Sequence, residues 1–249
     1  MRKILAAIVL IFIIFLAGWT VFVRNKAAAP GNSNQQSNST QTSTFDKNKY
    51  SISDPASPWL VVNKKNPLNP KTFVPADLAV ANVRLRLGKT EEQMKFSAQA
   101  IPDLEAMFAT AKNDGVELVF GSGYRSHALQ KQFYDSYVAK DGVEKADRYS
   151  ARPGHSEHQT GLAVDITRAD GKCHLEECFE DTEQGKWLAA NAYKYGFLLR
   201  YTTEKETVTG YQYEPWHFRY VGRELAEEMN KQNIETLEEF FNLPQASNY

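Results

Sequence analysis

Short apolar runs alternate with longer amphipathic stretches over roughly the last 200 residues, a length typical of one domain. The short runs predict strands over residues 116–120, 162–166, 197–201 and 213–220. The amphipathic stretches predict helices over residues 90–113, 127–139, 142–149, 183–195 and 223–242. Because these elements follow no regular βαβ order, we expect an α+β domain whose antiparallel sheet carries helices mainly on one side.

Residues that interrupt a helix refine these boundaries. Pro102 should kink the first helix or open a new one, because proline lacks the amide hydrogen that an inner helical turn needs. Gly196 is a typical stop for the helix that ends at residue 195. In the last helix, Asn233 or Thr236 should act as a break or a cap.

The N-terminus carries a different hydrophobic pattern. Residues 4–23 form an apolar run of twenty residues without a charge, the length needed to cross a hydrocarbon core of about 30 Å. A secretory signal has a shorter apolar core of roughly 7 to 15 residues. Arg24 and Lys26 also separate the run from the small residues that follow. We therefore expect residues 1–26 to be an uncleaved, single-pass membrane anchor with its N-terminus inside the cell and the folded domain outside the cytoplasm.

A polar segment separates the expected anchor from the domain. Residues 30–44 are mainly Ser, Asn, Gln and Thr and contain no aromatic residue. Such a sequence cannot bury enough apolar surface to offset the entropy lost on ordering. We assign residues 27–54 to a flexible linker and residues 55–249 to the folded domain.

Charge restricts the class of partner. The chain has 29 basic and 30 acidic residues and a formal net charge of -1. No strong electrostatic field therefore favours nucleic acid, and we expect none as a partner. A small uncharged or zwitterionic substrate remains compatible with this charge.

Two distant segments supply the candidate chemistry. His158 precedes the expected strand at 162–166 and Asp165 lies within it, while Glu214 and His217 belong to the expected strand at 213–220. Two imidazoles and one carboxylate suit zinc and can leave a fourth position for water. Each residue taken alone is more often an ordinary core, surface or turn residue. Their combination with a nearby glutamate favours a hydrolytic metal site at the sheet.

The site requires local departures from regular strands. Gly161 permits the tight turn that His158 and Asp165 need to meet at one ion. Side chains alternate faces along a strand, which would place Glu214 and His217 on opposite sides. Pro215 should relieve this, because proline does not join a regular central ladder.

The two cysteines leave alternatives open. Cys173 and Cys178 enclose four residues, a spacing compatible with a local disulfide in an oxidising compartment. Two free thiols would also fit the sequence. A zinc site formed with His174 is less favoured, because a structural zinc normally takes four ligands.

Three motifs resemble a known family in order and spacing. They are Ser122-Gly123-Tyr124-Arg125-Ser126, the segment from Ser156 to Asp165, and Glu214-Pro215-Trp216-His217. The chain resembles the VanY-type zinc D-alanyl-D-alanine carboxypeptidases and the related L,D-carboxypeptidases of bacterial cell walls. The resemblance runs from about Leu60 to Asn233.

The resemblance implies a role for each matching residue. It implies that zinc, Zn²⁺, is bound by His158, Asp165 and His217. Glu214 would be the general acid and base, which takes a proton from the attacking water and gives it to the departing amine. Arg125 would stabilise the oxyanion that develops on the scissile carbonyl and bind substrate.

Two further residues match family positions for which only a general role in substrate binding is implied. Ser156 and Gln130 correspond to positions associated with substrate binding. His127, His155 and His174 match no ligand position, although His155 lies close enough in sequence to support the site indirectly.

The resulting hypothesis is a membrane-tethered zinc carboxypeptidase that removes the terminal D-alanine from peptidoglycan stem peptides. D,D- and L,D-specificity are both compatible with these residues. The alternatives are a peptidoglycan endopeptidase and a non-catalytic, zinc-containing wall-binding module. A pure binding module has no need of Glu214 beside the metal, which favours the enzyme.

Overall fold

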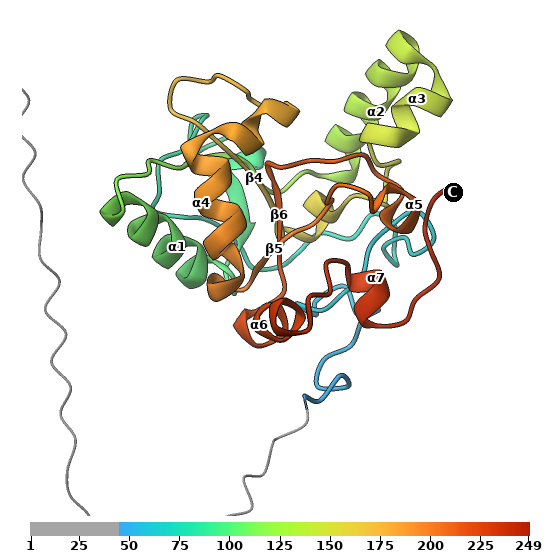
Figure 1. Cartoon of the computed structure of the whole chain (residues 1–249). Coiled ribbons are helices and arrows are strands. Elements are labelled where there is room, and N and C mark those ends of the chain that lie inside the picture. Colours follow the sequence, from blue (N-terminus) through green and yellow to red (C-terminus); the bar gives the residue numbers. More distant parts are fainter. Residues whose placement is uncertain (1–44) are drawn as a thin grey trace, which may run out of the picture. The chain divides into compact units, whose positions relative to one another are not determined.

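A four-stranded antiparallel sheet lies at the centre of the described part of the chain, residues 45–249 of a computed structural model (Figure 1). The strands follow the order β3-β4-β6-β5. Their bounds are Val119–Ser122 for β3, Ala163–Thr167 for β4, His217–Tyr220 for β6 and Phe197–Leu199 for β5. The two central strands, β4 and β6, therefore come from segments far apart in the sequence.

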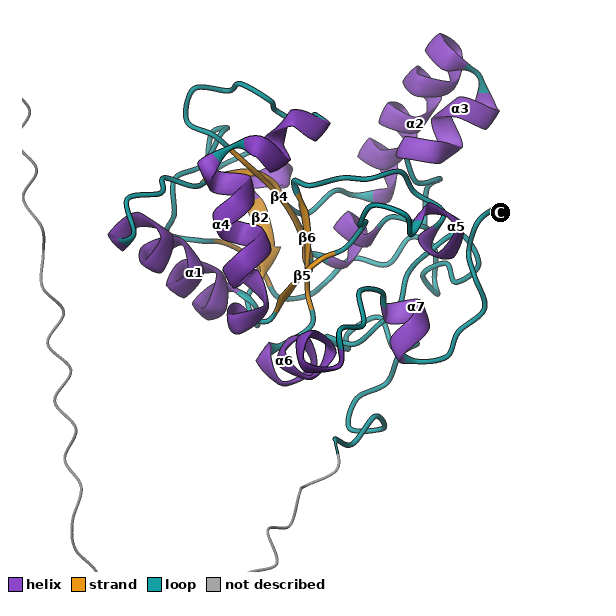
Figure 2. Ribbon diagram, in the orientation of Figure 1, coloured by secondary structure: helices purple, strands orange, loops and turns teal. Residues whose placement is uncertain are grey.

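One face of this sheet packs on the main core. Alternation along the strands directs Val164, Ile166 and Phe218 to that face, where all three are buried. Helices α1 (Ile101–Asn113) and α4 (Glu183–Asn191) cover it, as Figure 2 shows. The opposite face of the same strands carries polar side chains, and there the functional site forms.

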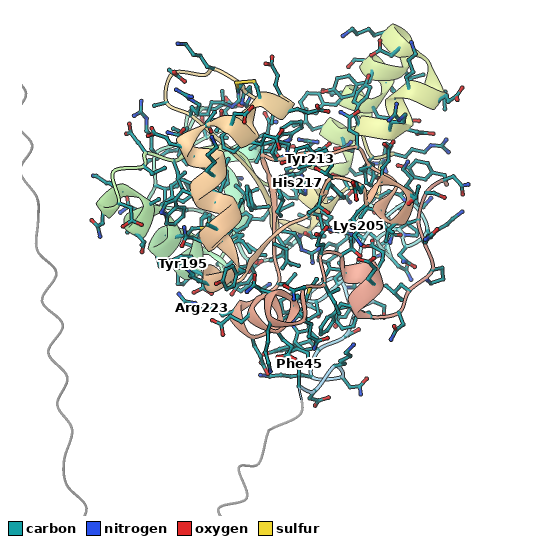
Figure 3. The ribbon with its side chains drawn as sticks, in the orientation of Figure 1. Phe45, Tyr195, Lys205, Tyr213, His217 and Arg223 are labelled. Carbon is teal, nitrogen blue, oxygen red and sulfur yellow. A yellow bond between two sulfur atoms is a disulfide. The ribbon has the colours of Figure 1, made fainter. Side chains whose placement is uncertain are left out.

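A second core lies beside the first. It contains Trp59 and the inner faces of α6 (Arg223–Gln232) and α7 (Leu237–Phe240). Phe45, which is labelled in Figure 3, stacks on Trp59 with ring centroids 5.4 Å apart. The stretch from residue 45 to 54, assigned above to the linker, thus contributes side chains to the folded unit.

The remaining elements surround the sheet. A two-stranded sheet joins β1 (Leu78–Val80) to β2 (Lys95–Ser97). Helices α2 (His127–Asp141) and α3 (Val143–Tyr149) form a hairpin that projects beside the sheet (Figure 1). The short helices are η1 (Glu92–Met94), η2 (Glu157–Thr160), η3 (Glu177–Asp181), η4 (Ala192–Tyr195) and α5 (Glu206–Thr209).

The α+β class with an antiparallel sheet is confirmed. Gly196 ends η4 with a φ of 82°, Asn233 ends α6 in the left-handed conformation and Thr236 caps α7, as the sequence indicates. The helix expected from residue 90 is wrong before residue 101, where η1 and β2 precede α1. The prediction that Pro102 opens a new helix is confirmed: it lies in the first turn of α1, where the missing amide hydrogen costs nothing.

The transmembrane prediction concerns residues 1–26, which lie outside the described part of the chain. Among the helices of residues 45–249, none is both long and apolar enough to cross a bilayer.

Candidate metal centre and active site

Strand register brings two of the predicted metal ligands together. Asp165 on β4 and His217 on β6 are direct cross-strand partners, and both project from the polar face of the sheet. His158 comes from η2, and Gly161 ends that helix with a φ of 69°, a left-handed turn that glycine adopts without strain. The expected reversal at Gly161 is confirmed, and it returns the chain from His158 to β4.

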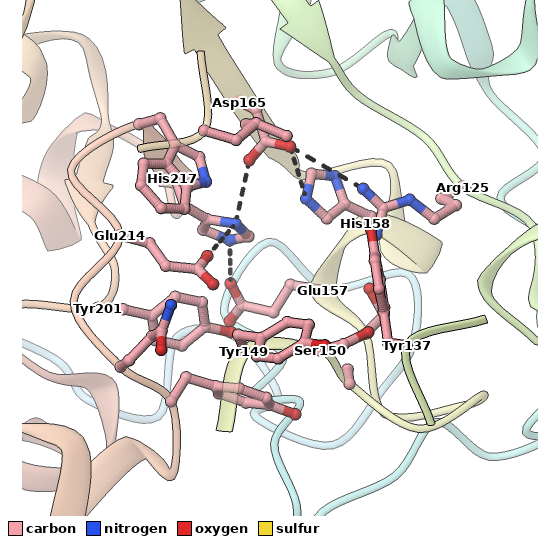
Figure 4. Close-up of a pocket in the computed structure, with 16 residues that line it drawn as sticks. Arg125, Tyr137, Tyr149, Ser150, Glu157, His158, Asp165, Tyr201, Glu214 and His217 are labelled. Carbon is pink, nitrogen blue, oxygen red and sulfur yellow. Dashed lines mark hydrogen bonds and ion pairs between the residues drawn. The ribbon is translucent and has the colours of Figure 1, made fainter. Parts of the chain in front are cut away.

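The three side chains form a compact, buried ligand set (Figure 4). His158 Nε2 lies 3.4 Å from Asp165 Oδ2, and His217 Nδ1 lies 3.3 Å from Asp165 Oδ1. One ligand atom from each residue lies within 4.8 Å of the others. Two neutral imidazoles and a carboxylate at this separation fit a zinc ion with an open coordination position.

The electrostatics of Asp165 also fit a cation. Burial opposes ionisation of this carboxyl, but His158 and His217 outweigh burial and hold its pKa well below the usual range. Asp165 Oδ1 is buried and accepts no well-formed hydrogen bond from the described residues. A buried carboxylate oxygen without such a partner is costly unless a cation compensates it.

Each imidazole is oriented by its second ring nitrogen. His158 Nδ1 lies 2.7 Å from the Gly123 carbonyl oxygen and must donate to it. This leaves Nε2 as the atom that faces Asp165. His217 uses the opposite nitrogen, because its Nε2 lies 3.3 Å from a carboxylate oxygen of Glu157.

A tight turn places Glu214 beside the ligands. The His217 amide donates to the Glu214 carbonyl at 3.0 Å, so residues 214–217 turn before β6 begins. The prediction of a continuous strand from residue 213 is therefore wrong at its start. Glu214 Oε2 lies 3.6 Å from His217 Nδ1. The two side chains therefore point to the same side, whereas a regular strand would place them on opposite faces. For the polypeptide alone, burial raises the pKa of Glu214 to about 8.

Arg125 faces the ligand set from the loop that follows β3. Its Nη1 donates to Gln130 Oε1 at 2.9 Å, and its Nη2 lies 3.9 Å from Asp165 Oδ2. The guanidinium also lies over the Phe133 ring, 5.2 Å from its centroid. Arg125 Nε is buried and donates to no described residue. These contacts hold the guanidinium in place beside the ligand set.

The other predicted binding residues occupy different positions. Ser156 lines the cavity beside the ligand set and is buried. Gln130 lies behind Arg125, where it also donates to the Ala151 carbonyl oxygen at 2.6 Å. His155 Nδ1 lies 3.0 Å from the Asn63 carbonyl oxygen and His174 Nδ1 lies 3.2 Å from Thr167 Oγ1.

The ligand set opens into a cavity of about 220 Å³. Aromatic side chains form much of its wall, a feature that the sequence analysis missed: Tyr137, Tyr149, Tyr201, Tyr211 and Trp216. They come from α2, α3 and the loops before β6, which no local periodicity links to one another. Such a wall can pack against an apolar or planar part of a ligand.

Cys173 and Cys178 form a disulfide, one of the alternatives that the sequence leaves open, with Cα atoms 5.5 Å apart. The bond closes a loop whose Leu175 is 41% exposed and lines the active-site cavity. Both sulfurs are used in this bond, so the cysteines offer no thiolate to a metal.

We expect the double variant Cys173→Ser/Cys178→Ser to lose about 2 kcal/mol of unfolding free energy, because the loop is no longer closed in the unfolded chain. KM should rise, since Leu175 loses its fixed place at the cavity. Denaturant unfolding and steady-state kinetics measure the two effects. A reductant should change the wild type in the same direction and leave the double variant unaffected. Unchanged stability and KM in the variant would contradict this role of the loop.

The fold and the buried His-Asp-His set define a zinc peptidase. The family described as VanY, D-alanyl-D-alanine carboxypeptidase, matches residues 93–223. Putative carboxypeptidase YodJ of Bacillus subtilis is 42% identical over 190 residues, which cover 76% of this chain and 69% of YodJ. A D-alanyl-D-alanine carboxypeptidase of Enterococcus faecalis is 36% identical over 74% of this chain and 65% of its own length. The chain belongs to the VanY D-alanyl-D-alanine carboxypeptidase family.

Solved structures agree with this assignment. The LdcB LD-carboxypeptidase has a TM-score of 0.71 and 41% identity, covering 77% of this chain and 88% of LdcB. The D,D-pentapeptidase VanY was solved as a glutamate-to-alanine mutant with Zn(II). It has a TM-score of 0.61 and 34% identity, and the match covers 75% of this chain and 99% of the VanY chain. The protein is a zinc enzyme of this family, with His158, Asp165 and His217 as its metal ligands.

Proposed function

We propose that the protein is a membrane-tethered carboxypeptidase that removes the terminal D-alanine from peptidoglycan stem peptides. One observation carries the proposal: Glu214 and Arg125 converge on the zinc ligands from two different loops, within one cavity. A proton carrier and a donor for an oxyanion are the two groups that peptide hydrolysis needs beside a metal.

His158, Asp165 and His217 would hold the zinc ion, which would supply Lewis acidity and make water a better nucleophile near neutral pH. Glu214 accepts a proton from the attacking water and later delivers it to the amine that leaves. Arg125 donates to the oxygen on which negative charge develops, through the guanidinium group whose Nη2 lies 3.9 Å from Asp165 Oδ2. Ser156 lines the same cavity and can donate a hydrogen bond to the peptide.

Two specificities are supported by relatives. LdcB is an LD-carboxypeptidase and VanY a D,D-pentapeptidase, and this chain has the higher identity and TM-score with LdcB. We favour the L,D activity, in which the D-alanine of a tetrapeptide stem leaves from the L centre of a diamino acid.

The test offers purified zinc-loaded protein defined tetrapeptide and pentapeptide stems and follows the products by mass spectrometry. We expect release of one alanine, faster from the tetrapeptide, and none after chelation of the metal. Faster release from the pentapeptide would identify the D,D activity instead. Internal fragments would indicate an endopeptidase, and no product from either stem would contradict the enzymatic proposal.

The membrane tether is a separate part of the proposal, supported by the uncharged run at residues 4–23. Cell fractionation should recover the full chain with membranes and a chain that lacks residues 1–26 in the soluble fraction. Recovery of both forms in the soluble fraction would contradict the anchor.

A further inference from the structure

Glu157, the neighbour of the zinc ligand His158, has a buried carboxylate that touches the other histidine ligand. Its Oε2 lies 3.3 Å from His217 Nε2 (Figure 4). The side chain is completely buried. The contact joins residues sixty positions apart in the sequence.

Two arginines fix the other oxygen of this carboxylate. Arg200 Nε donates to Glu157 Oε1 at 2.8 Å, and Arg219 Nη1 donates to the same oxygen at 3.0 Å. Both arginines are buried and are held by further partners. Arg200 Nη2 donates to Glu238 Oε1 at 2.7 Å, and Arg200 Nη1 donates to Glu238 Oε2 at 3.0 Å. Arg219 donates to the Leu60 carbonyl oxygen at 2.7 Å.

This arrangement leaves Glu157 one orientation. Rotation of its carboxylate would break two charge-assisted hydrogen bonds to buried guanidinium groups, each stronger than a neutral bond. Oε2 therefore stays directed at His217, where an ionised carboxylate can only accept. His217 must carry a proton on Nε2, which leaves the Nδ1 lone pair on the side of Asp165 and the metal.

We propose that Glu157 is a positioning residue of the zinc site: its carboxylate fixes the tautomer and the ring orientation of His217. The proposal rests on the zinc ligands and not on the identity of the peptide substrate. Partners of this kind orient metal-bound histidines and raise their basicity, and their loss typically costs about 10- to 100-fold in metal affinity.

A purely structural role is the competing explanation, because Glu157 also neutralises buried arginines. Glu238 offers a matched control. Its side chain is equally buried and pairs with the same Arg200, but no contact joins it to a zinc ligand in the described residues. A change at Glu238 therefore disturbs the ion pair with Arg200 but leaves the contact between Glu157 and His217 in place.

The experiment compares Glu157→Gln with Glu238→Gln in the full chain. A glutamine has one acceptor oxygen and one donor nitrogen at its end. In Glu157→Gln the arginines require the oxygen, so the NH₂ group turns to His217. Nε2 must then accept, which moves the ring proton to Nδ1, the atom that should bind zinc.

Zinc affinity is measured by competition with a chromophoric chelator, and stability by denaturant unfolding of the zinc-loaded proteins. We expect Glu157→Gln to bind zinc about 10- to 100-fold more weakly than wild type. Glu238→Gln should lose stability but keep the wild-type zinc affinity. Equal losses of affinity in both variants, or no loss in Glu157→Gln, would overturn the proposal.

A second measurement needs no variant and therefore does not depend on whether Glu157→Gln folds. Ring ¹⁵N spectra of the histidine-labelled, zinc-loaded wild type report which nitrogen of His217 carries the proton. We expect a slowly exchanging, low-field Nε2–H, because the proton is buried against a carboxylate. A proton on Nδ1, or an Nε2–H that exchanges freely with solvent, would refute the role of Glu157.

Discussion

Replacing Glu214 with glutamine should lower kcat by about 100- to 10,000-fold, the contribution expected of a positioned general acid and base. The amide has nearly the same size as the carboxyl but cannot accept the proton of the attacking water. Zinc should remain bound, because His158, Asp165 and His217 supply the ligands and Glu214 lies beside them, 3.6 Å from His217 Nδ1.

The measurement is steady-state release of D-alanine by the zinc-loaded variant, with the metal content determined on the same sample. Glu227→Gln makes the identical chemical change at an exposed position of α6 and should behave as wild type. Turnover near the wild-type rate in a fully zinc-loaded Glu214→Gln protein would remove Glu214 from the proposed mechanism.

The zinc ligands could be predicted from sequence because their chemistry is concentrated in short motifs. His158 and Asp165 lie on either side of one turn, and Gly161 marks that turn. Residue types suggested His217 as the third ligand and the family resemblance implied it, but local periodicity carries no information on which strands pair. The structure supplies the missing link as the direct pairing of β4 with β6.

Helix and strand types were predictable where the pattern was long or clearly bounded. The helices at 127–139 and 142–149 correspond to α2 and α3, with Gly142 between them at a φ of 81°. The prediction failed for residues 90–100, because the helical pattern that begins at residue 101 was extended back over Met94 and Phe96, although their i, i+2 spacing is that of a strand. In the folded domain, tertiary packing places both in the main core from a short helix and a strand instead.

Buried charge was the least predictable feature. Glu157, Arg200, Arg219 and Glu238 read as surface residues in the sequence, because charged side chains are seldom fully buried. Their burial is tolerated because each guanidinium meets a carboxylate within 3.0 Å. Only the assembly of η2, β6, α7 and the end of β5 brings these partners together.

Replacing Arg125 with methionine should reduce kcat/KM by about 100- to 1,000-fold, the effect of losing one preorganised oxyanion donor. Methionine retains much of the side-chain volume but removes the charge and all donors. Zinc should stay bound, because Arg125 is no ligand and lies 3.9 Å from Asp165 Oδ2. The measurement is kcat and KM for a stem tetrapeptide at saturating zinc.

Two further variants distinguish the positive charge of Arg125 from the orientation of its hydrogen-bond donors. Arg125→Lys keeps a positive charge but lacks the planar fork, so it should recover only part of the lost rate. Gln130→Leu leaves the guanidinium intact and removes the acceptor that holds its Nη1 at 2.9 Å. Its rate should lie between those of wild type and Arg125→Met, because the donor remains but is less well oriented. If lysine restored the full rate, a point charge would suffice and the planar guanidinium of Arg125 would have no special part in the reaction.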